Sequence, residues 1–329
     1  MPAARLRTWL STLLLAFLCA CAHAPEANDV LARTALPLEQ DWRFRLGHAP
    51  AEAALPAYDD SGWEQVSLPH SWNAIGEYRL ERSNGTRNAQ GIGWYRLRLD
   101  GVQLPPGDRV FLQFDGVGNV ADIWVNGTHV GRHAGAFSRF RFDITDALDR
   151  TGTNLIAVRA DNARPEPGST TQHVIPLLGD FFIHGGLYRP VSLVAVPDAH
   201  IDLLDHGGPG IYGRTVSVQP ERAEIEVLTR LRNSAGTLRA LTLEAEVRDA
   251  EGRVVAQART PLRLAPGAGA EVQRLTVPSP RLWNGRQDPY LYSLSVTLRD
   301  GDRALDRVVE PLGIRSFRID SGPGFFLKG

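Results

Sequence analysis

Histidine and cysteine, the residues most often used to bind zinc, are poorly placed for that role in this chain. The only two cysteines, Cys19 and Cys21, lie within the first 21 residues, so the body of the chain has no disulfide framework and no cysteine-based zinc site. Of the nine histidines, His129 and His133 have the i, i+4 spacing of a zinc-binding helix. The residues around them predict a hairpin and a loop, where that spacing does not bring two side chains together. The sequence therefore gives no support to a zinc site.

Residues 116–121 match the letters of a dinucleotide-binding loop, G-x-G-x-x-A, after a predicted strand. A loop of that kind must open a helix whose N-terminus receives the pyrophosphate. The residues that follow instead change face with a period of two, which is typical of a strand. We therefore interpret 116–121 as a connection between strands and not as a cofactor site.

The stretch from Val120 to Asp143 has the clearest strand pattern in the chain. One face of its first predicted strand carries Ala121, Ile123 and Val125, and the opposite face carries Val120, Asp122 and Trp124. Asn126-Gly127 follows, and both residues tolerate the positive φ of a two-residue hairpin turn. After a second strand and a loop, an apolar face of Phe140, Phe142 and Ile144 marks a third strand. The pattern predicts a β-sandwich hairpin with a loop at its end.

Length and composition indicate a globular protein of two or three domains. The chain has 329 residues and a net charge of −1, so nothing points to nucleic acid as a partner. Its 32 glycines and 22 prolines are scattered, which fits a fold with many turns. Strand signals begin at Arg33, and after Pro197 about seven short strands predict an immunoglobulin-like sandwich.

The N-terminus has the features of an export signal. Two arginines precede an apolar run from Trp9 to Phe17, which is too short to span a membrane. The following Leu18–Cys21 resembles the cleavage box of bacterial lipoproteins, which implies a signal peptide over 1–21, a lipid anchor on Cys21 and a linker over 22–32. The alternative is an ordinary secretory signal cut near Ala22 or Ala24. We expect an exported protein, either an outer-membrane lipoprotein or a periplasmic one.

Several segments, in the right order, resemble glycoside hydrolase family 2, which includes β-galactosidases, β-glucuronidases and β-mannosidases. The segments are LPHSWN at 68–73, WVNG at 124–127 with FRFDIT at 140–145, GGLYR at 185–189, LWN and PYLY between 282 and 292, GIRSF at 313–317 and GFFLKG at 324–329. Three positions depart from the family pattern, where Asp, Asp and Asn are usual: Ser71, Pro190 and Lys328.

The resemblance covers residues 36–329 and implies an all-β fold. It implies a galactose-binding-like jelly-roll β-sandwich over 33–197, then an immunoglobulin-like β-sandwich over 198–315, and the start of a linker over 316–329. In the family this linker leads to a catalytic (β/α)₈ barrel. We expect that barrel to be absent from this chain, because the two sandwiches and the linker leave no room for the roughly 250 residues that a barrel needs.

The family consists of retaining glycosidases, in which two glutamates of the barrel flank the scissile bond. One of them follows an Asn, and this chain contains no Asn-Glu pair. We therefore expect the chain to be the non-catalytic front half of a β-galactosidase-like exo-glycosidase in carbohydrate metabolism, and to be inactive alone. An incomplete product of a longer gene is favoured over a relative without a barrel, because the chain stops inside a family phrase.

The resemblance also implies candidate binding residues. Asp180 stands seven positions before Leu187, where an acidic residue of the β-galactosidase branch contacts sugar hydroxyls or a bound cation. Its alternative role is to cap a loop turn. Gln90, three positions before Gly93, and the nearby Asn88 are candidates to orient a sugar hydroxyl. A cation near Asp180 is the only cofactor implied. The expected partners are a β-glycoside, the missing barrel, a membrane reached through the lipid anchor, and further copies of the chain in a homo-oligomer.

Trp72, Trp94 and Trp124 have two alternative roles. Their indole faces suit the CH-rich face of a sugar ring, but we favour packing in the core or against the barrel. Among the histidines, His184 deserves notice because it precedes the GGLYR segment. Two alternative functions stay open from the sequence: an anchored carbohydrate-binding module without an enzyme, and a β-sandwich scaffold or adhesin that binds protein.

Overall fold

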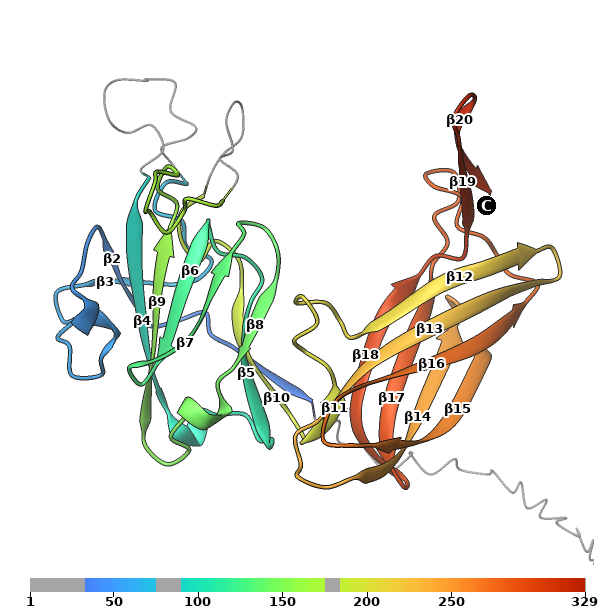
Figure 1. Cartoon of the computed structure of the whole chain (residues 1–329), viewed down its shortest axis with the longest axis horizontal. Helices are drawn as coiled ribbons and strands as arrows, with labels where there is room; N and C mark the ends of the chain where they lie inside the picture. Colours follow the sequence, from blue (N-terminus) through green and yellow to red (C-terminus); the bar gives the residue numbers. More distant parts are fainter. Residues whose placement is uncertain (1–32, 75–89, 175–183, 329) are drawn as a thin grey trace, which may run out of the picture. The chain divides into compact units, whose positions relative to one another are not determined.

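The computed structural model describes residues 33–74, 90–174 and 184–328, and it is built almost entirely from strands (Figure 1). Its only helices there are short 3₁₀ turns, such as η1 (Ala51–Ala54). In the part of the chain that the structure describes, no helix is long and apolar enough to span a membrane. The all-β fold expected from the sequence is confirmed.

The first sandwich consists of two antiparallel sheets. A six-stranded sheet has the order β3-β2-β4-β9-β6-β7, and a four-stranded sheet has the order β1-β10-β5-β8. The strands are β1 (Thr34–Pro37), β2 (Trp42–Leu46), β3 (Glu64–Val66), β4 (Ile92–Asp100), β5 (Arg109–Phe114), β6 (Val120–Val125), β7 (Thr128–Ala134), β8 (Phe140–Asp143), β9 (Thr153–Asp161) and β10 (Val191–Val196). Neighbours in a sheet are therefore often distant in the sequence, which is the jelly-roll pattern.

One hydrophobic core lies between these two sheets. It holds fully buried side chains from both of them, among them Trp42, Tyr95, Leu112, Ile123 and Leu193. Burying one such side chain contributes about 1.5–3 kcal/mol, so the period-two pattern of each strand fixes which face turns inward. The apolar face predicted for 121–125 points into this core.

The predicted hairpin within 120–134 is present and has the expected turn. β6 pairs with β7, and the connecting residues Asn126 and Gly127 have φ values of 52° and 84°. The Asn126 side chain holds the turn, since its Nδ2 donates to the Ala147 carbonyl at 2.9 Å and its Oδ1 accepts from the Leu155 N–H at 2.8 Å. Asn suits this position because its side chain satisfies neighbouring backbone groups while its backbone tolerates positive φ.

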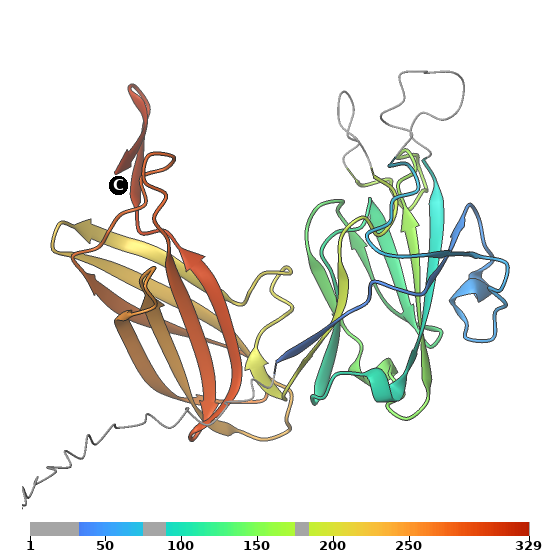
Figure 2. The same ribbon diagram turned by 180° about the vertical axis from the view of Figure 1, so that it is seen from behind.

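The second sandwich also has two antiparallel sheets (Figure 2). In one, β13 pairs with β11, β12 and β16, and the other has the order β15-β14-β17-β18. Its strands are β11 (Ala199–Ile201), β12 (Ile211–Gln219), β13 (Arg222–Asn233), β14 (Arg239–Arg248), β15 (Val254–Leu264), β16 (Gly267–Pro278), β17 (Tyr292–Asp300) and β18 (Arg303–Leu312). A second core, with Ile225, Leu243 and Val296 at its centre, lies between the sheets, as in an immunoglobulin-like sandwich.

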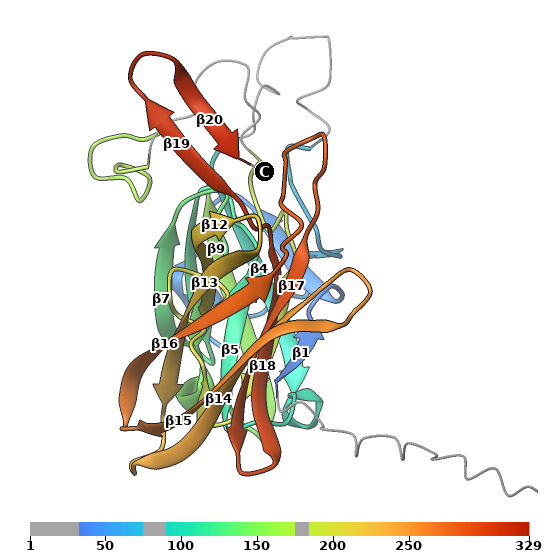
Figure 3. The same ribbon diagram turned by 90° about the vertical axis from the view of Figure 1, so that its right-hand side faces the viewer.

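The last described strands, β19 (Ser316–Asp320) and β20 (Gly324–Lys328), form a two-stranded hairpin (Figure 3). Several of its large apolar side chains are exposed: Phe317, Ile319, Phe325 and Phe326. Phe317 and Phe325 stack on each other with their ring centroids 5.9 Å apart.

Arg96 of β4 is a residue whose surroundings the sequence did not reveal. Strand alternation predicts that it points away from the core, and it does, yet its side chain is completely buried. The segment around η1 covers it, and Arg96 donates to the carbonyls of Leu55 and Tyr58 at 3.1 and 3.2 Å. Its Nε donates to a carboxylate oxygen of Asp60 at 2.6 Å. Part of the outer face of the six-stranded sheet is thus sealed by the chain itself.

Candidate functional site

Of the predicted binding residues, only Gln90 lies within the described part of the chain. Cys21, Asn88 and Asp180 lie outside it. Gln90 is half-buried just before β4, and its Oε1 accepts a hydrogen bond from Arg164 Nε at 3.3 Å. The next residue, Gly91, exchanges hydrogen bonds with Asn162 after β9, so Gln90 is held beside the end of that strand.

Two segments that resemble the family lie side by side at this end of the sandwich. The Gly185 N–H donates to Asn73 Oδ1 at 3.0 Å, and the His70 N–H donates to the Leu187 carbonyl at 2.8 Å. A Cβ at Gly185 would come within 2.1 Å of the Trp72 ring, so only glycine permits this approach. Residues 185–187 are therefore held against residues 70–73.

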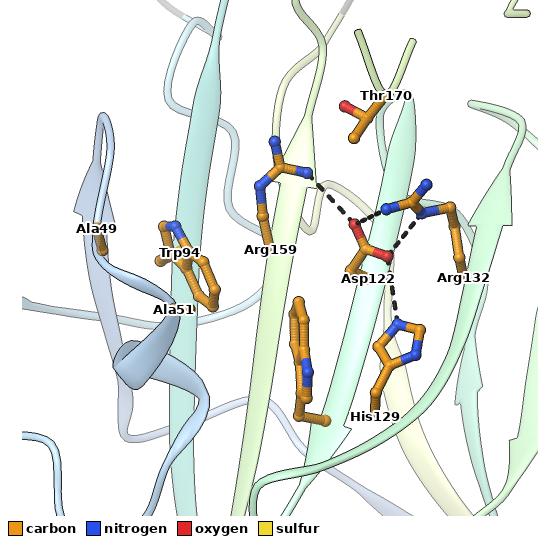
Figure 4. A pocket seen from close by; sticks show the side chains of 9 residues that line it. Ala49, Ala51, Trp94, Asp122, His129, Arg132, Arg159 and Thr170 are labelled. Atoms are coloured by element: carbon orange, nitrogen blue, oxygen red, sulfur yellow. Dashed lines mark hydrogen bonds and ion pairs between the residues drawn. The ribbon is translucent and has the colours of Figure 1, made fainter. Parts of the chain in front are cut away.

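A concave feature lies on the outer face of the six-stranded sheet, and the strand register explains it (Figure 4). Trp94 of β4 pairs with Arg159 of β9, Arg159 with Asp122 of β6, and Asp122 with Arg132 of β7. These four residues form one row across four neighbouring strands. Because paired residues share a face, all four side chains point away from the core.

The adjacent row contributes a second indole. Trp124 pairs with His129 on one side and with Ala157 on the other. The small Ala157 side chain leaves room for the Trp124 and Trp94 rings to stack, with centroids 5.4 Å apart and planes at 23°. Together with Ala49, Ala51 and Thr170, these side chains enclose an open hollow of about 550 Å³, which we call the sheet-face hollow.

A buried carboxylate organises the polar wall of the sheet-face hollow. The Asp122 side chain is only 3 % exposed. It accepts hydrogen bonds from Arg132 Nε at 2.7 Å and Nη2 at 3.1 Å, and from Arg159 Nη1 at 3.3 Å, while His129 Nε2 lies 3.3 Å away. The hydrogen bond with Asp122 raises the pKa of Arg132. Arg159 also donates to Asp161, which accepts a further hydrogen bond from the Thr170 hydroxyl.

The described carboxyl groups with a shifted pKa do not have the pKa expected of a glycosidase acid. A glycosidase acid needs a raised pKa and a second carboxyl nearby. Among the described carboxyl groups with a shifted pKa, every one is lowered: Asp59, Asp60, Asp149, Glu226 and Asp249. In the same described ranges, no group of three or more histidine, cysteine, aspartate or glutamate side chains could hold a metal ion.

Sequence reasoning named both indoles of the hollow but missed its charged residues. It favoured a packing role for Trp94 and Trp124; Trp94 is buried, whereas Trp124 is only partly buried and lines the hollow. Asp122, Arg132 and Arg159 were not predicted. The available signal was an Asp two positions before a Trp on the non-core face of a predicted strand, where a solvated residue is the usual choice.

The described part of the chain thus has two β-sandwiches in succession, the first a jelly roll, an architecture that lectin domains share with viral capsid proteins and cupins. Comparison with known protein families identifies the same family in both sandwiches. The description "Glycosyl hydrolases family 2, sugar binding domain" matches residues 37–197, and "Glycosyl hydrolases family 2" matches residues 212–315. The chain belongs to glycoside hydrolase family 2, which confirms the resemblance seen in the sequence.

Similar proteins carry two activities in their names. A β-glucuronidase of Bacteroides fragilis is 33 % identical over 97 % of this chain and 42 % of its own length. The β-galactosidase BoGH2A of Bacteroides ovatus is 34 % identical over 88 % of this chain and 32 % of its own length. The crystal structure of a Bacteroides uniformis β-glucuronidase superposes with a TM-score of 0.79 at 33 % identity, over 90 % of this chain and 34 % of that one. The chain thus spans less than half the length of these relatives.

Proposed function

We propose that the chain supplies the sugar-binding and immunoglobulin-like part of a retaining exo-β-glycosidase of carbohydrate metabolism, acting on a β-galactoside or a β-glucuronide. The observation that carries this proposal is the match of both sandwiches to family 2, whose similar members are named β-glucuronidases and β-galactosidases. Within this function the end of the first sandwich that holds Gln90 contributes to the sugar site, together with Asn88 and Asp180.

We further propose that this part is non-catalytic and that the reacting carboxyl pair belongs to a (β/α)₈ barrel. The lowered pKa values of the shifted carboxyl groups support this, since none of them suits a general acid. The β19–β20 hairpin supports a covering partner. Its side chains Phe317, Ile319 and Phe325 are 62–77 % exposed, and clustered exposed apolar groups usually mark an interface.

Hydrolysis of a panel of chromogenic β-glycosides tests the proposal. The purified 329-residue chain should show no turnover, and the longest product of the gene should hydrolyse a β-galactoside or a β-glucuronide. In that longest product, Asp180→Ala should lower kcat/KM at least about tenfold, because a carboxylate that holds sugar hydroxyls is lost. Turnover by the 329-residue chain that one point change within it abolishes would show that the non-catalytic assignment is wrong.

We also propose that Cys21 is lipidated and holds the protein at the outer membrane. Several acyl chains on one residue anchor firmly, since each buried CH₂ contributes about 0.8 kcal/mol. The Cys21→Ser variant should then move from the membrane fraction to the soluble periplasmic fraction, as judged by immunoblotting of fractionated cells. If the wild-type protein and the Cys21→Ser variant are found in the same fractions, the result would favour the ordinary secretory signal instead.

A further inference from the structure

The sheet-face hollow has no role in the proposed function. We propose that it binds a pyranose unit of a glycan, with Trp124 as the stacking surface and Arg132 and Arg159 as hydrogen-bond donors to ring oxygens and hydroxyl groups. The inference does not depend on the proposed catalytic assignment, because it concerns binding by side chains of this chain alone.

The aromatic side of the hollow is already arranged for a ring. Trp124 is partly exposed, and its indole rests on Trp94, which packs with the apolar side chains of Ala53, Ala54 and Trp63. This stack restricts the Trp124 rotamer before a ligand arrives, so little side-chain freedom is lost on binding. An indole face attracts the CH-rich face of a sugar while the hydroxyl groups remain free for polar contacts.

The polar side of the hollow supplies donors that are fixed in place but not all used. A guanidinium group has five N–H donors. The hydrogen bonds of Arg132 to Asp122 use Nε and Nη2, and those of Arg159 to Asp122 and Asp161 use Nη1 and Nη2. Each arginine therefore keeps N–H groups beyond these bonds. Figure 4 shows the two guanidinium groups on either side of Asp122, in the wall of the hollow.

Size and charge favour a sugar over other ligands. The hollow of about 550 Å³ falls within the usual 300–1,000 Å³ range of small-molecule sites. The two guanidinium charges are balanced by Asp122 and Asp161, so the wall has no excess charge to attract a polyanion. An aromatic surface beside oriented donors, without net charge, suits a ligand with one apolar face and many oxygen atoms.

Isothermal titration of the purified chain with β-linked galactose- and glucuronate-terminated oligosaccharides tests this inference. We expect saturable binding of at least one oligosaccharide. Trp124→Ala should weaken it at least tenfold, and Arg132→Gln, which changes only the donor side, should weaken it several-fold. Phe137→Ala is the matched control, because Phe137 is a half-exposed aromatic of the same sandwich that does not line the hollow, and it should leave the affinity unchanged.

Far- and near-ultraviolet circular dichroism of each variant separates loss of binding from loss of folding. If Trp124→Ala is misfolded, Arg132→Gln decides the outcome. Two results would overturn the inference: the absence of saturable binding to every oligosaccharide, and binding that folded Trp124→Ala and Arg132→Gln variants retain in full.

Discussion

Replacement of Asp60 by alanine is expected to lower the free energy of unfolding by about 3–5 kcal/mol. The Asp60 carboxylate is buried and pairs with Arg96 Nε at 2.6 Å and with Arg98 Nη1 at 2.7 Å. Arg98 can turn into water, but the Arg96 side chain is completely buried and would keep only carbonyl partners. A buried guanidinium without its counter-charge is among the most destabilising defects known in proteins.

The same carboxylate should make stability depend on pH. Burial raises the pKa of Asp60, but the hydrogen bonds and positive charges of Arg96 and Arg98 outweigh that effect, so its pKa lies below the ordinary value of 3.8. A lowered carboxyl pKa means that the unfolded chain binds the proton more readily. The stabilisation by Asp60 is therefore complete well above pH 3.8 and is lost as the pH falls through its folded-state pKa.

Urea unfolding of the wild type, Asp60→Ala and a control measures this effect. Glu52→Ala is a suitable control because Glu52 is an exposed acid in the same covering segment, and it should change stability by less than about 0.5 kcal/mol. The difference between wild type and Asp60→Ala should shrink when unfolding is repeated below pH 3.8. A loss of less than 1 kcal/mol at neutral pH would contradict the assigned role of the Asp60–Arg96 pair.

Local features of the fold could be predicted from the sequence, whereas features that depend on distant segments could not. The Asn126-Gly127 turn is encoded by two adjacent residues and was predicted correctly. The environment of Arg96 depends on Asp60, which lies 36 residues away, and strand alternation shows only the face on which Arg96 lies. A period-two pattern contains no information on what covers that face.

The sheet-face hollow was missed for a similar reason. Its row of side chains exists because β9 lies between β4 and β6, although β5 separates β4 from β6 in the sequence and belongs to the other sheet. The candidates Asp180, Gln90 and Asn88 came from the family resemblance. The strand pattern of the sequence does not by itself indicate a sugar-binding role for them. The hollow, by contrast, follows from register, and only the structure supplies the register.

The segment around η1 that covers Arg96 connects the buried Asp60–Arg96 pair with the sheet-face hollow. Residues near η1 seal Arg96 through carbonyl groups and Asp60, and the same segment places Ala49 and Ala51 at the edge of the hollow. Trp94 lies in the same strand as Arg96, two positions before it and on the same face. Loss of Asp60 should therefore loosen one wall of the hollow, so stability and sugar binding are expected to fall together in Asp60→Ala.

Asp122→Ala should lower the free energy of unfolding by about 3 kcal/mol and abolish sugar binding in the hollow. The substitution leaves Arg132 and Arg159 facing each other without the carboxylate between them. Arg159 retains Asp161, and the half-exposed Arg132 can move into water, so the loss should lie at the lower end of the range for buried pairs. Arg132 would then no longer be held in the wall of the hollow.

A double-mutant cycle isolates the contribution of this pair. If Asp122 and Arg132 act together, the double variant Asp122→Ala/Arg132→Ala should be less destabilised than the sum of the single variants, by about 1 kcal/mol or more. Asp146→Ala provides the control, because Asp146 is 90 % exposed, lies 3.5 Å from Arg109 and should contribute little. Additive losses in the cycle would mean that the Asp122–Arg132 contact adds no coupling energy. In that case, the rigidity of the donors in the hollow must come from Arg159 and Asp161.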